Sequence, residues 1–325
     1  MNTPSGKPRK VIPIASADPQ NEIASLYEAQ KKVYPRSISG YFARWRWILV
    51  FFTQIVFYGL PWLQWGERQI MLFDLGARRF YLFGLVLYPQ DFIYLTTLLI
   101  ISALALFLFT AVAGRLWCGF ACPQTVYTEI FMWVENKIEG DRSARMKLDK
   151  GPLTARKIGL KAFKHAIWLV ISLWTGFTLV AYFTPVDELL AALPFGFSGW
   201  ELFWTFFYGG FCYMQAGFLR EQVCKYMCPY ARFQGVIFDS DTLVITYDPE
   251  RSEPRGARKK GADSQALGDC VDCGLCVAVC PTGIDIRKGI QYECIGCGAC
   301  IDACDPVMDK VGKPRGLIRY TTENA

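Results

Sequence analysis

Long runs of apolar residues dominate the first part of the chain. Four of them reach the roughly 20 residues that an α-helix needs to cross the hydrocarbon core of a bilayer. They lie at about 45–65, 91–113, 165–184 and 201–219. The pattern therefore predicts an α-helical membrane protein with four transmembrane helices. A fifth run, Phe80–Tyr88, is too short to cross and is followed by Pro89, so we expect an interfacial or re-entrant segment there.

The charged residues around these runs predict how the helices are oriented. Residues 1–46 carry eight Lys/Arg against three Asp/Glu, and residues 135–164 carry nine against four. The loop at 184–199 has two acidic residues and no basic residue. Lys and Arg are enriched in cytoplasmic loops. We therefore expect both termini in the cytoplasm, residues 184–199 outside, and everything after the fourth helix on the cytoplasmic side.

Composition shows which metal ligands the chain can offer. The 325 residues include 13 Cys but only one His, His165, which excludes sites built from several imidazoles. Eight of the cysteines follow residue 269. Because this region is expected in the reducing cytoplasm, metal binding by sulfur is favoured over disulfides. The net charge of +6 is too small to indicate nucleic acid as a partner.

The eight C-terminal cysteines form two runs of C-x2-C-x2-C-x3-C, the spacing of bacterial ferredoxins. In such runs three thiolates surround one cubane cluster, and the fourth binds the cluster of the other run. One predicted [4Fe–4S] cluster is therefore bound by Cys270, Cys273, Cys276 and Cys304. The other is bound by Cys294, Cys297, Cys300 and Cys280. The C-terminal part should form an α+β ferredoxin-like module.

Residues around the cysteines support this assignment. Gly274, Gly296 and Gly298 lie within the runs, where backbone that turns around a cluster needs the positive φ that glycine adopts at low cost. One departure from the ferredoxin pattern is that Asp305, rather than proline, follows the last cysteine. Zinc fits less well, because zinc ribbons use paired ligands with a longer gap between the pairs. A purely structural role of the clusters is the alternative to electron relay.

Two further pairs of cysteines lie at the ends of the second and fourth predicted transmembrane helices. Both have the form C-x3-C-P, and the four residues are Cys118, Cys122, Cys224 and Cys228. Each pair follows a helical hairpin, which indicates a weak parallel repeat that would bring the four thiols to one depth. Four thiolates suit Cu(I), although Zn²⁺ or a further cluster would also fit. The alternative is that these cysteines only fill space between helices.

The proline after each pair predicts a break in the chain. We expect the transmembrane helix to end near Cys118 and a new helix to begin at Pro123. Its apolar stripe should lie on the membrane surface and is formed by Val126, Ile130, Val134 and Ile138. A cysteine at a helix N-terminus beside an arginine should have a lowered pKa. The membrane-edge pairs are therefore expected to be thiolates.

These patterns divide the chain into four parts. They are a cytoplasmic N-terminal tail at 1–44, a four-helix membrane domain at 45–237, a linker at 238–269 and a ferredoxin-like two-cluster domain at 270–325.

Several stretches resemble a known family. The segment RLWCGFACPQTVYTEIFMWVENKIEGDR, from Arg115 to Arg142, is similar to the signature of the cytochrome c oxidase accessory proteins called FixG, RdxA or CcoG. Shorter stretches that agree are YPQDF at 88–92, YMCPYARFQ at 226–234, YDPER at 247–251 and GLIRY at 316–320. The resemblance covers nearly the whole chain from residue 35 onward. Family members typically continue into a fifth span and a periplasmic immunoglobulin-like domain, so this sequence is either a short form or part of a longer chain.

The resemblance implies a multi-pass protein of the bacterial inner membrane with a cytoplasmic iron–sulfur domain. Members carry two [4Fe–4S] clusters and act as cupric reductases, reducing Cu(II) to Cu(I) for the assembly of cbb-type cytochrome oxidase. The catalytic and copper-binding residues would be those of the two C-x3-C-P motifs, Cys118, Cys122, Cys224 and Cys228. The implied partners are membrane lipid, copper ions, a copper transporter or oxidase assembly factors, and an electron donor that the sequence does not identify.

Two alternatives to cupric reduction stay open. Ferredoxin-like membrane subunits of nitrate and nitrous oxide respiration share the plan of four spans, C-x3-C-P pairs and two clusters, which would make the protein a quinol-linked electron conduit. The second alternative is a non-enzymatic assembly scaffold with structural clusters.

Overall fold

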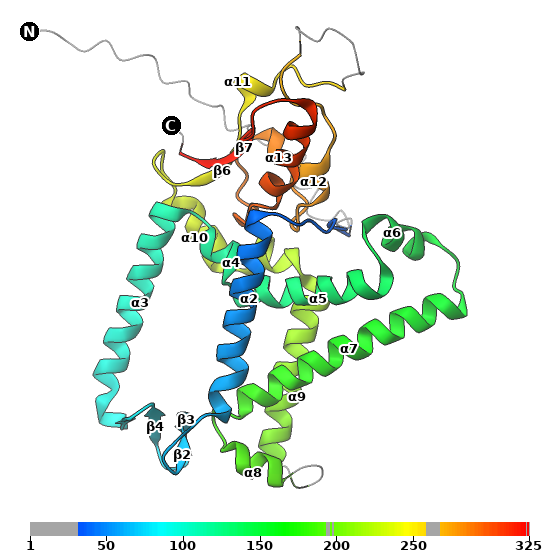
Figure 1. Ribbon diagram of the computed structural model, residues 1–325. Coiled ribbons are helices and arrows are strands. Elements are labelled where there is room, and N and C mark those ends of the chain that lie inside the picture. The colour runs from blue at the N-terminus through cyan, green and yellow to red at the C-terminus, as the bar shows by residue number, and fades with distance from the viewer. Residues whose placement is uncertain (1–31, 193–195, 197, 258–266, 323, 325) are drawn as a thin grey trace, which may run out of the picture. The chain divides into compact units, whose positions relative to one another are not determined.

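The computed structural model describes residues 32–322 and 324, except 193–195, 197 and 258–266. Residues 34–325 form one compact unit, which is mostly helical (Figure 1). Most of the predicted N-terminal tail, residues 1–31, lies outside the described residues.

The four apolar runs form four of the helices labelled in Figure 1. They are α2 (Tyr41–Gly59), α3 (Phe92–Ala113), α7 (Ala155–Val180) and α9 (Gly199–Met214), and α9 continues as a π-helix over Gln215–Leu219. Two segments are long and apolar enough to cross a membrane, Pro89–Ala113 and Ala155–Val180. The other two fall short because Arg44 and Arg46 lower the hydropathy of α2, and because α9 has only 16 residues. Among the described residues there are therefore two candidate membrane helices, whereas four were predicted.

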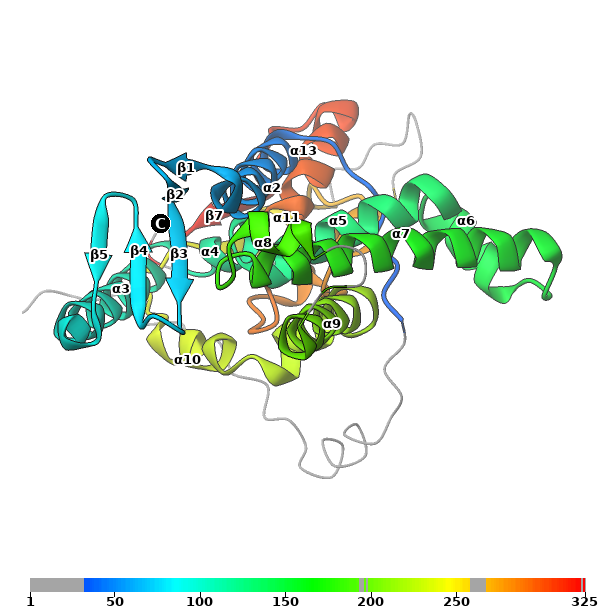
Figure 2. The same cartoon turned by 90° about the horizontal axis from the view of Figure 1, so that it is seen from below.

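The short run Phe80–Tyr88 forms β-strands. Strands β3 (Met71–Asp74), β4 (Arg79–Leu82) and β5 (Leu85–Leu87) make one antiparallel sheet in that order (Figure 2). Tight turns at Arg78 and Phe83, both with positive φ, reverse the chain twice. The expectation of an interfacial or re-entrant segment missed these strands, because sheet pairing satisfies the backbone of a run too short to span. The smaller elements nearby are η1 (Leu60–Trp62), β1 (Gln64–Trp65), β2 (Arg68–Gln69), η2 (Pro89–Asp91) and α8 (Val186–Ala191).

Helices α4 (Leu116–Phe120), α5 (Pro123–Glu139) and α6 (Arg142–Lys150) follow α3. Helix α5 begins at the predicted proline. Its apolar stripe, however, does not lie on a membrane surface: Phe131 and Val134 are buried against Trp168 of α7 and Ala216 of the π-helix. The stripe faces other helices of the same chain because α7 and the end of α9 cover it.

Helices α7 and α9 approach each other closely at two glycines. A Cβ atom at Gly176 would overlap the carbonyl oxygen of Thr205, and one at Gly209 would lie 3.1 Å from the carbonyl oxygen of Ser172. Small residues let two helix backbones approach when both lie in a membrane. The contact therefore depends on glycine at these positions.

The C-terminal module contains α12 (Leu275–Ala278), η5 (Ile286–Lys288), α13 (Ala299–Val311) and the antiparallel pair β6 (Val244–Tyr247) and β7 (Ile318–Thr321). Strand β6 lies in the segment predicted to be a linker, which also holds α11 (Pro249–Ser252). Ile245 and Tyr247 are buried in the same core as Leu317 and Ile318. The segment at 238–269 thus supplies one strand of the module because every second side chain of β6 fits its core.

Two sets of hydrogen bonds join this module, and the segment that leads into it, to helices α2 and α3. The Asp302 carboxylate of α13 accepts from the backbone N–H groups of Phe42 (3.2 Å) and Ala43 (2.8 Å), and so caps the N-terminus of α2. At the end of α3, the Ala111 carbonyl accepts from the Thr242 hydroxyl at 2.8 Å. The next carbonyl accepts from the backbone N–H of Leu243 at 3.1 Å. Backbone groups at the N-terminus of α2 are therefore satisfied by a residue of the module, and those at the C-terminal end of α3 by the segment that leads into β6.

The glycine contact between α7 and α9 gives a first prediction. Gly176→Ala should lower the melting temperature of the detergent-solubilised protein, because the added methyl group forces the helices apart. Overpacking of this kind costs about 1–3 kcal/mol. Gly210→Ala in the partner helix α9 is the control, since a Cβ there meets open space, and alanine favours a helix over glycine. Equal melting temperatures for the two variants would contradict the close contact.

Candidate iron–sulfur and membrane-edge cysteine sites

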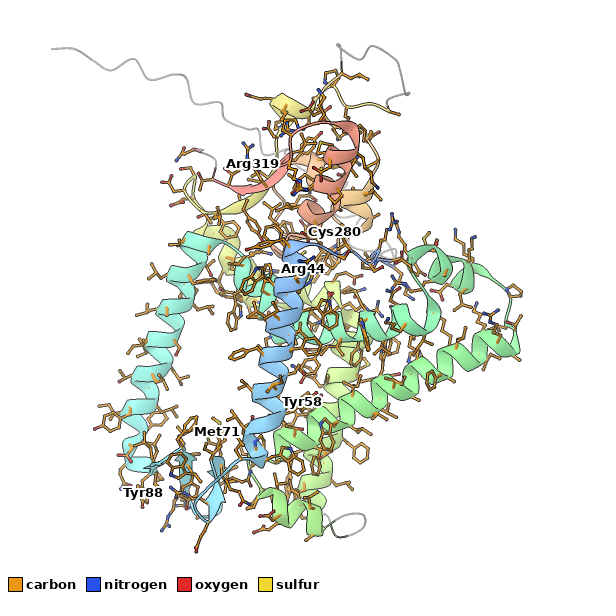
Figure 3. The ribbon with its side chains drawn as sticks, in the orientation of Figure 1. Arg44, Tyr58, Met71, Tyr88, Cys280 and Arg319 are labelled. Atoms are coloured by element: carbon orange, nitrogen blue, oxygen red, sulfur yellow. The ribbon has the colours of Figure 1, made fainter. Side chains whose placement is uncertain are left out.

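Each predicted set of cluster ligands lines one pocket of the C-terminal module. The first cluster pocket is lined by Cys270, Cys273, Cys276 and Cys304. The second cluster pocket is lined by Cys280, Cys294, Cys297 and Cys300, with Cys276 at its edge. The fourth cysteine of each run thus lies with the first three of the other run. Figure 3 shows Cys280 at the end of the module that faces α2 and Arg44.

The donor sets of the two pockets fit a [4Fe–4S] cluster. Four thiols surround each pocket, and a cubane takes one thiolate for each of its irons. Across the described residues, the C-x3-C-P thiols included, no three His, Cys, Asp or Glu side chains are close enough together as they stand to hold one metal ion. The choice of a cluster over a single zinc ion for the pockets therefore rests on the spacing of the cysteines and on the thiols that line each pocket.

The backbone around the pockets has the conformation expected from the glycines. Gly274, Gly296 and Gly298 have φ values of 65°, 64° and 71°. Gly274 and Gly298 are also the N-caps of α12 and α13. The prediction of positive φ at these three positions is confirmed. The helix of Cys304 continues through the residue that replaces the expected proline, since Asp305 lies inside α13.

Burial controls the protonation of the pocket thiols. It raises the pKa of Cys276 to about 11 and that of Cys304 to about 12 in the first pocket. It also raises the pKa of Cys294 to about 12 in the second pocket. The free thiols therefore keep their protons at neutral pH. Cluster binding, which needs thiolates, must release these protons.

The two C-x3-C-P motifs have closely similar local structure. Cys122 and Cys228 are the N-caps of α5 and α10 (Pro229–Ile237), with ψ values of 129° and 112° before proline. The first cysteine of each pair lies one turn earlier, in α4 or in a second π-helix (Val223–Met227). Cys224 interacts electrostatically with the other three thiols, and Cys118 with Cys122 and Cys228. The structure thus brings together the four thiols that the sequence placed at one depth.

Residues flanking each motif bind the other motif. The Cys118 thiol donates a hydrogen bond to Oε1 of Gln234 in α10 (3.5 Å), and Gln234 is fully buried. The Arg115 guanidinium donates to the carbonyl oxygen of Ala231, also in α10. In the other direction, Nε2 of Gln124 donates to the Arg220 carbonyl at 3.2 Å. These reciprocal bonds hold the two pairs together.

The pKa values of the membrane-edge thiols differ from the expectation. The position beside Arg115 was expected to lower the pKa, but burial raises that of Cys118 to about 11 and that of Cys224 to about 12. Burial likewise raises the pKa of Cys122. The arginine does act in the expected direction, but loss of solvation is the larger effect. Without a bound metal Cys118, Cys122 and Cys224 are therefore thiols rather than thiolates.

The membrane-edge thiols adjoin the second cluster pocket. Cys118 and Cys224 pack against the group of buried residues that contains Ile295 and Cys297. Gly119 makes this contact possible, because a Cβ there would lie 2.7 Å from the carbonyl oxygen of Gly296. The second pocket, and not the first, is thus the neighbour of the C-x3-C-P motifs.

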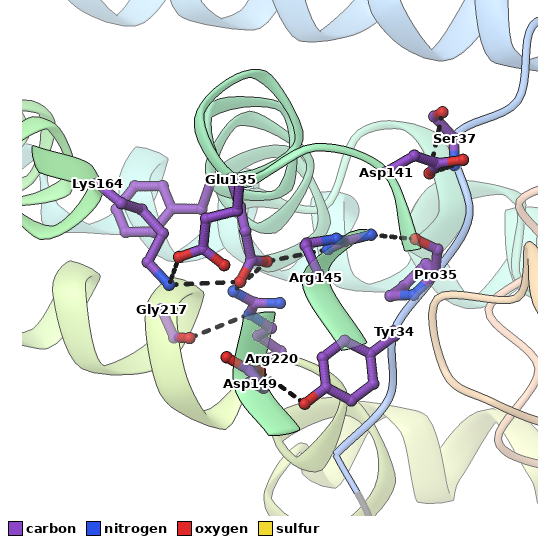
Figure 4. A network of polar contacts seen from close by, with 12 residues as sticks. Tyr34, Pro35, Ser37, Glu135, Asp141, Arg145, Asp149, Lys164, Gly217 and Arg220 are labelled. Atoms are coloured by element: carbon purple, nitrogen blue, oxygen red, sulfur yellow. Dashed lines mark hydrogen bonds and ion pairs between the residues drawn. The ribbon is translucent and has the colours of Figure 1, made fainter. Parts of the chain in front are cut away.

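A buried ion network fixes the second motif to α5 (Figure 4). Glu135 is 1% exposed, and its carboxylate contacts Arg145 at 3.1 Å, Arg220 at 2.9 Å and Lys164 at 3.4 Å. Lys164 also pairs with Glu139 at 2.8 Å. Because Arg220 lies four residues before Cys224, this network positions the turn that leads into the second pair.

Sequence analysis did not single out Gln234, Gly119 or Arg46. Arg46 is a charged residue inside an apolar run, which was the one available signal, and its guanidinium contacts the Cys297 thiol. For Gln234 and Gly119 the sequence carries no comparable signal, because their roles come from contacts with distant segments.

Comparison with known families defines the class of protein. Residues 219–323 match the profile described as "4Fe-4S dicluster domain", and residues 95–140 match that of a "4Fe-4S binding domain". Together with the two cysteine-lined pockets, these matches define a ferredoxin-type iron–sulfur protein that binds 4Fe–4S clusters.

Curated relatives place the chain more closely. It is 45% identical to nitrogen fixation protein FixG of Rhizobium meliloti over 91% of this chain and 58% of that protein. It is 43% identical to protein RdxA of Cereibacter sphaeroides over 91% of this chain and 63% of that protein. The chain belongs to the family of FixG, RdxA and RdxB, and it spans about six tenths of the length of these relatives.

A more distant relative matches part of the chain. Ferredoxin-type protein NapH of Haemophilus influenzae is 27% identical over 56% of this chain and 66% of that protein. No solved structure matches the chain.

The two pockets predict the metal content of the protein. Anaerobically purified protein should contain about eight iron and eight acid-labile sulfide per chain, four of each for a cubane cluster. Cys273→Ser should reduce the iron content, because serine replaces a thiolate of the first pocket. Cys212→Ser is the control, since Cys212 lies in α9 outside both pockets, and it should keep the full content. Stoichiometric zinc with little iron would overturn the assignment.

Proposed function

We propose that this protein is an electron-transfer protein of the bacterial inner membrane that reduces Cu(II) to Cu(I) at its membrane-edge thiols, for assembly of cbb-type cytochrome oxidase. The main support is the direct contact between these thiols and the second cluster pocket, through Gly119. The cupric activity itself is carried over from the family resemblance. The proposed partners are membrane lipid, copper ions, a one-electron donor in the cytoplasm, and a copper transporter or oxidase assembly factors.

The most exposed of the predicted cluster ligands belongs to the first pocket. When bound, the [4Fe–4S] clusters supply one-electron oxidation and reduction. Cys273 of the first pocket is exposed, whereas the four cysteines of the second pocket are half-buried or buried. We propose Cys273 as the side from which a soluble electron donor approaches. The second pocket lies against the membrane-edge thiols.

The membrane-edge thiols supply the ligand chemistry that the reaction needs. Cu(II) takes up one electron to become Cu(I), and soft sulfur ligands favour the reduced ion. Because the pKa of Cys118 is about 11 and that of Cys224 about 12, copper binding at neutral pH releases protons. Gln234, which accepts the hydrogen bond from Cys118, keeps this thiol oriented until the ion binds.

A membrane location agrees with the two candidate membrane helices. We propose that α2 and α9, extended by the π-helix, complete a set of four spans. The excess of Lys and Arg in residues 135–164 supports a cytoplasmic location for that loop and for the ferredoxin module.

A second candidate function is supported by one specific observation. The match to a 4Fe-4S binding domain at residues 95–140 contains Cys118 and Cys122 but none of the C-terminal cysteines. The membrane-edge thiols could thus hold a further iron–sulfur cluster in place of copper. The protein would then relay electrons to an acceptor other than Cu(II).

Replacing both cysteines of one pair distinguishes these candidates. If the thiols bind copper, Cys118→Ser with Cys122→Ser should abolish Cu(I) binding and Cu(II) reduction and leave the iron content near that of the wild type. The measurements are iron analysis, Cu(I) competition with a chelator, and Cu(II) reduction with dithionite as electron source.

Two other outcomes of this experiment are informative. Loss of iron together with activity supports the further cluster. Wild-type Cu(II) reduction in the variant with all four serines would show that these cysteines only pack between helices. Cys212→Ser again serves as the control.

The topology can be tested by chemical labelling. A cysteine introduced by Ser198→Cys, at the N-cap of α9, should react with a membrane-impermeant maleimide from the outer face of spheroplasts. Ser143→Cys in α6 is the matched control and should react only after the membrane is opened. Labelling of Ser198→Cys from the cytoplasmic side alone would rule out the four-span arrangement.

A further inference from the structure

Two arginines of the membrane part are buried against the second cluster pocket. Arg46 lies in the second turn of α2 and Arg115 at the N-cap of α4, and each is 5% exposed. Neither side chain is a proposed ligand of iron or copper. A buried cation is costly unless a negative charge or several hydrogen bonds compensate it. The groups that compensate the positive charges of these two arginines therefore indicate what the arginines do.

Arg115 has no carboxylate partner among the described residues. Its guanidinium donates to the carbonyl oxygens of Ala231 and, at 3.5 Å, of Cys294. Its buried Nε has no hydrogen-bond partner. Arg115 interacts electrostatically with Cys294 of the second pocket and with Cys118 and Cys224, which become thiolates only when they bind a metal. The positive charge thus lies between the second pocket and the membrane-edge thiols.

Arg46 approaches the second pocket from helix α2. Its guanidinium contacts the thiol of Cys297. Its carboxylate partner is Glu129 at 3.7 Å, but at Cys297 the effect of the arginine exceeds that of the glutamate. The Asp302 carboxylate nearby is engaged by the N-terminus of α2. The second pocket therefore has a buried cation at Cys297 in addition to Arg115.

The first pocket differs, because its arginine is paired with two carboxylates. Arg287, which lines this pocket, pairs with Asp285 at 2.8 Å and with Asp272. Asp305 acts on Cys304 in the direction that disfavours added negative charge, while at Cys276 the effect of Arg287 exceeds that of Asp285.

We propose that Arg115 and Arg46 are the counter-charges of the second cluster pocket and raise the reduction potential of a cluster bound there above that of a cluster in the first pocket. Reduction adds one negative charge, which a buried cation stabilises, and cluster potentials depend on such local charge. The transfer moves one electron between the pockets and makes or breaks no bond. The potential difference directs this electron toward the membrane edge, a step that rests on the proposed function.

Redox titration of the anaerobic protein tests this ordering. With dithionite as reductant and electron paramagnetic resonance as readout, the wild type should show two one-electron midpoints. Arg115→Gln and Arg46→Gln should each lower the higher midpoint and leave the lower one in place. Arg287→Gln is the reciprocal control and should move only the lower midpoint. The proposal is wrong if Arg115→Gln and Arg46→Gln move neither midpoint, or move the lower one.

A second variant covers loss of folding. Arg115→Lys keeps the charge and removes the guanidinium fork, so its midpoints should stay close to those of the wild type. If Arg115→Gln loses iron, Arg46→Gln and Arg115→Lys still decide the matter: a lowered upper midpoint in the first and an unchanged one in the second support the proposal. Unshifted midpoints in Arg46→Gln, or a lowered upper midpoint in Arg115→Lys, contradict it.

The same samples separate this inference from the copper proposal. The midpoints are measured without copper, so the ordering can hold even if the wild type fails to reduce Cu(II). Conversely, Cu(II) reduction by the wild type with no effect of the arginines on either midpoint would retain the function and reject the ordering.

Discussion

The contact between the backbone at Gly119 and the backbone at 295–297 is the constraint on which the arrangement of the sites depends. A Cβ atom at Gly119 would lie 2.7 Å from one carbonyl oxygen and 2.8 Å from the next. Two backbone segments can approach this closely only where no side chain intervenes. The second cluster pocket and the C-x3-C-P thiols are therefore neighbours because of a missing side chain in the middle of the first motif.

Polar groups buried around this contact hold it in place. Asp302 binds the start of α2, Arg115 and Gln234 join the first motif to α10, and the carboxylate of Glu135 holds Arg220 before the second motif. Buried ion pairs contribute little net stability, but removing one partner leaves the other charge uncompensated. Their more important effect here is geometric. Each one specifies how a segment of the membrane part meets the ferredoxin module.

The sequence was sufficient where structure follows from local spacing. The cysteine runs predicted which thiols share a pocket, and Pro123 marked the start of α5, because both depend on residues close together in the chain. It was insufficient where distant segments decide. The stripe of α5 is covered by α7 rather than lipid, and β6 was hidden in a presumed linker because its partner β7 lies about 70 residues later. The predicted direction of the pKa shift of Cys118 was wrong for the same reason, since the sequence shows the adjacent arginine but not the degree of burial.

The hydrogen bonds at the C-terminal end of α3 join this helix to a segment that is synthesised much later. The carbonyl groups of Ala111 and Val112 are satisfied by Thr242 and Leu243, which the ribosome adds only after the fourth apolar run has been made. Until then this end of α3 lacks its partners. The hydrogen bonds that complete the C-terminal end of α3 therefore form only once the segment that starts the iron–sulfur module has been synthesised.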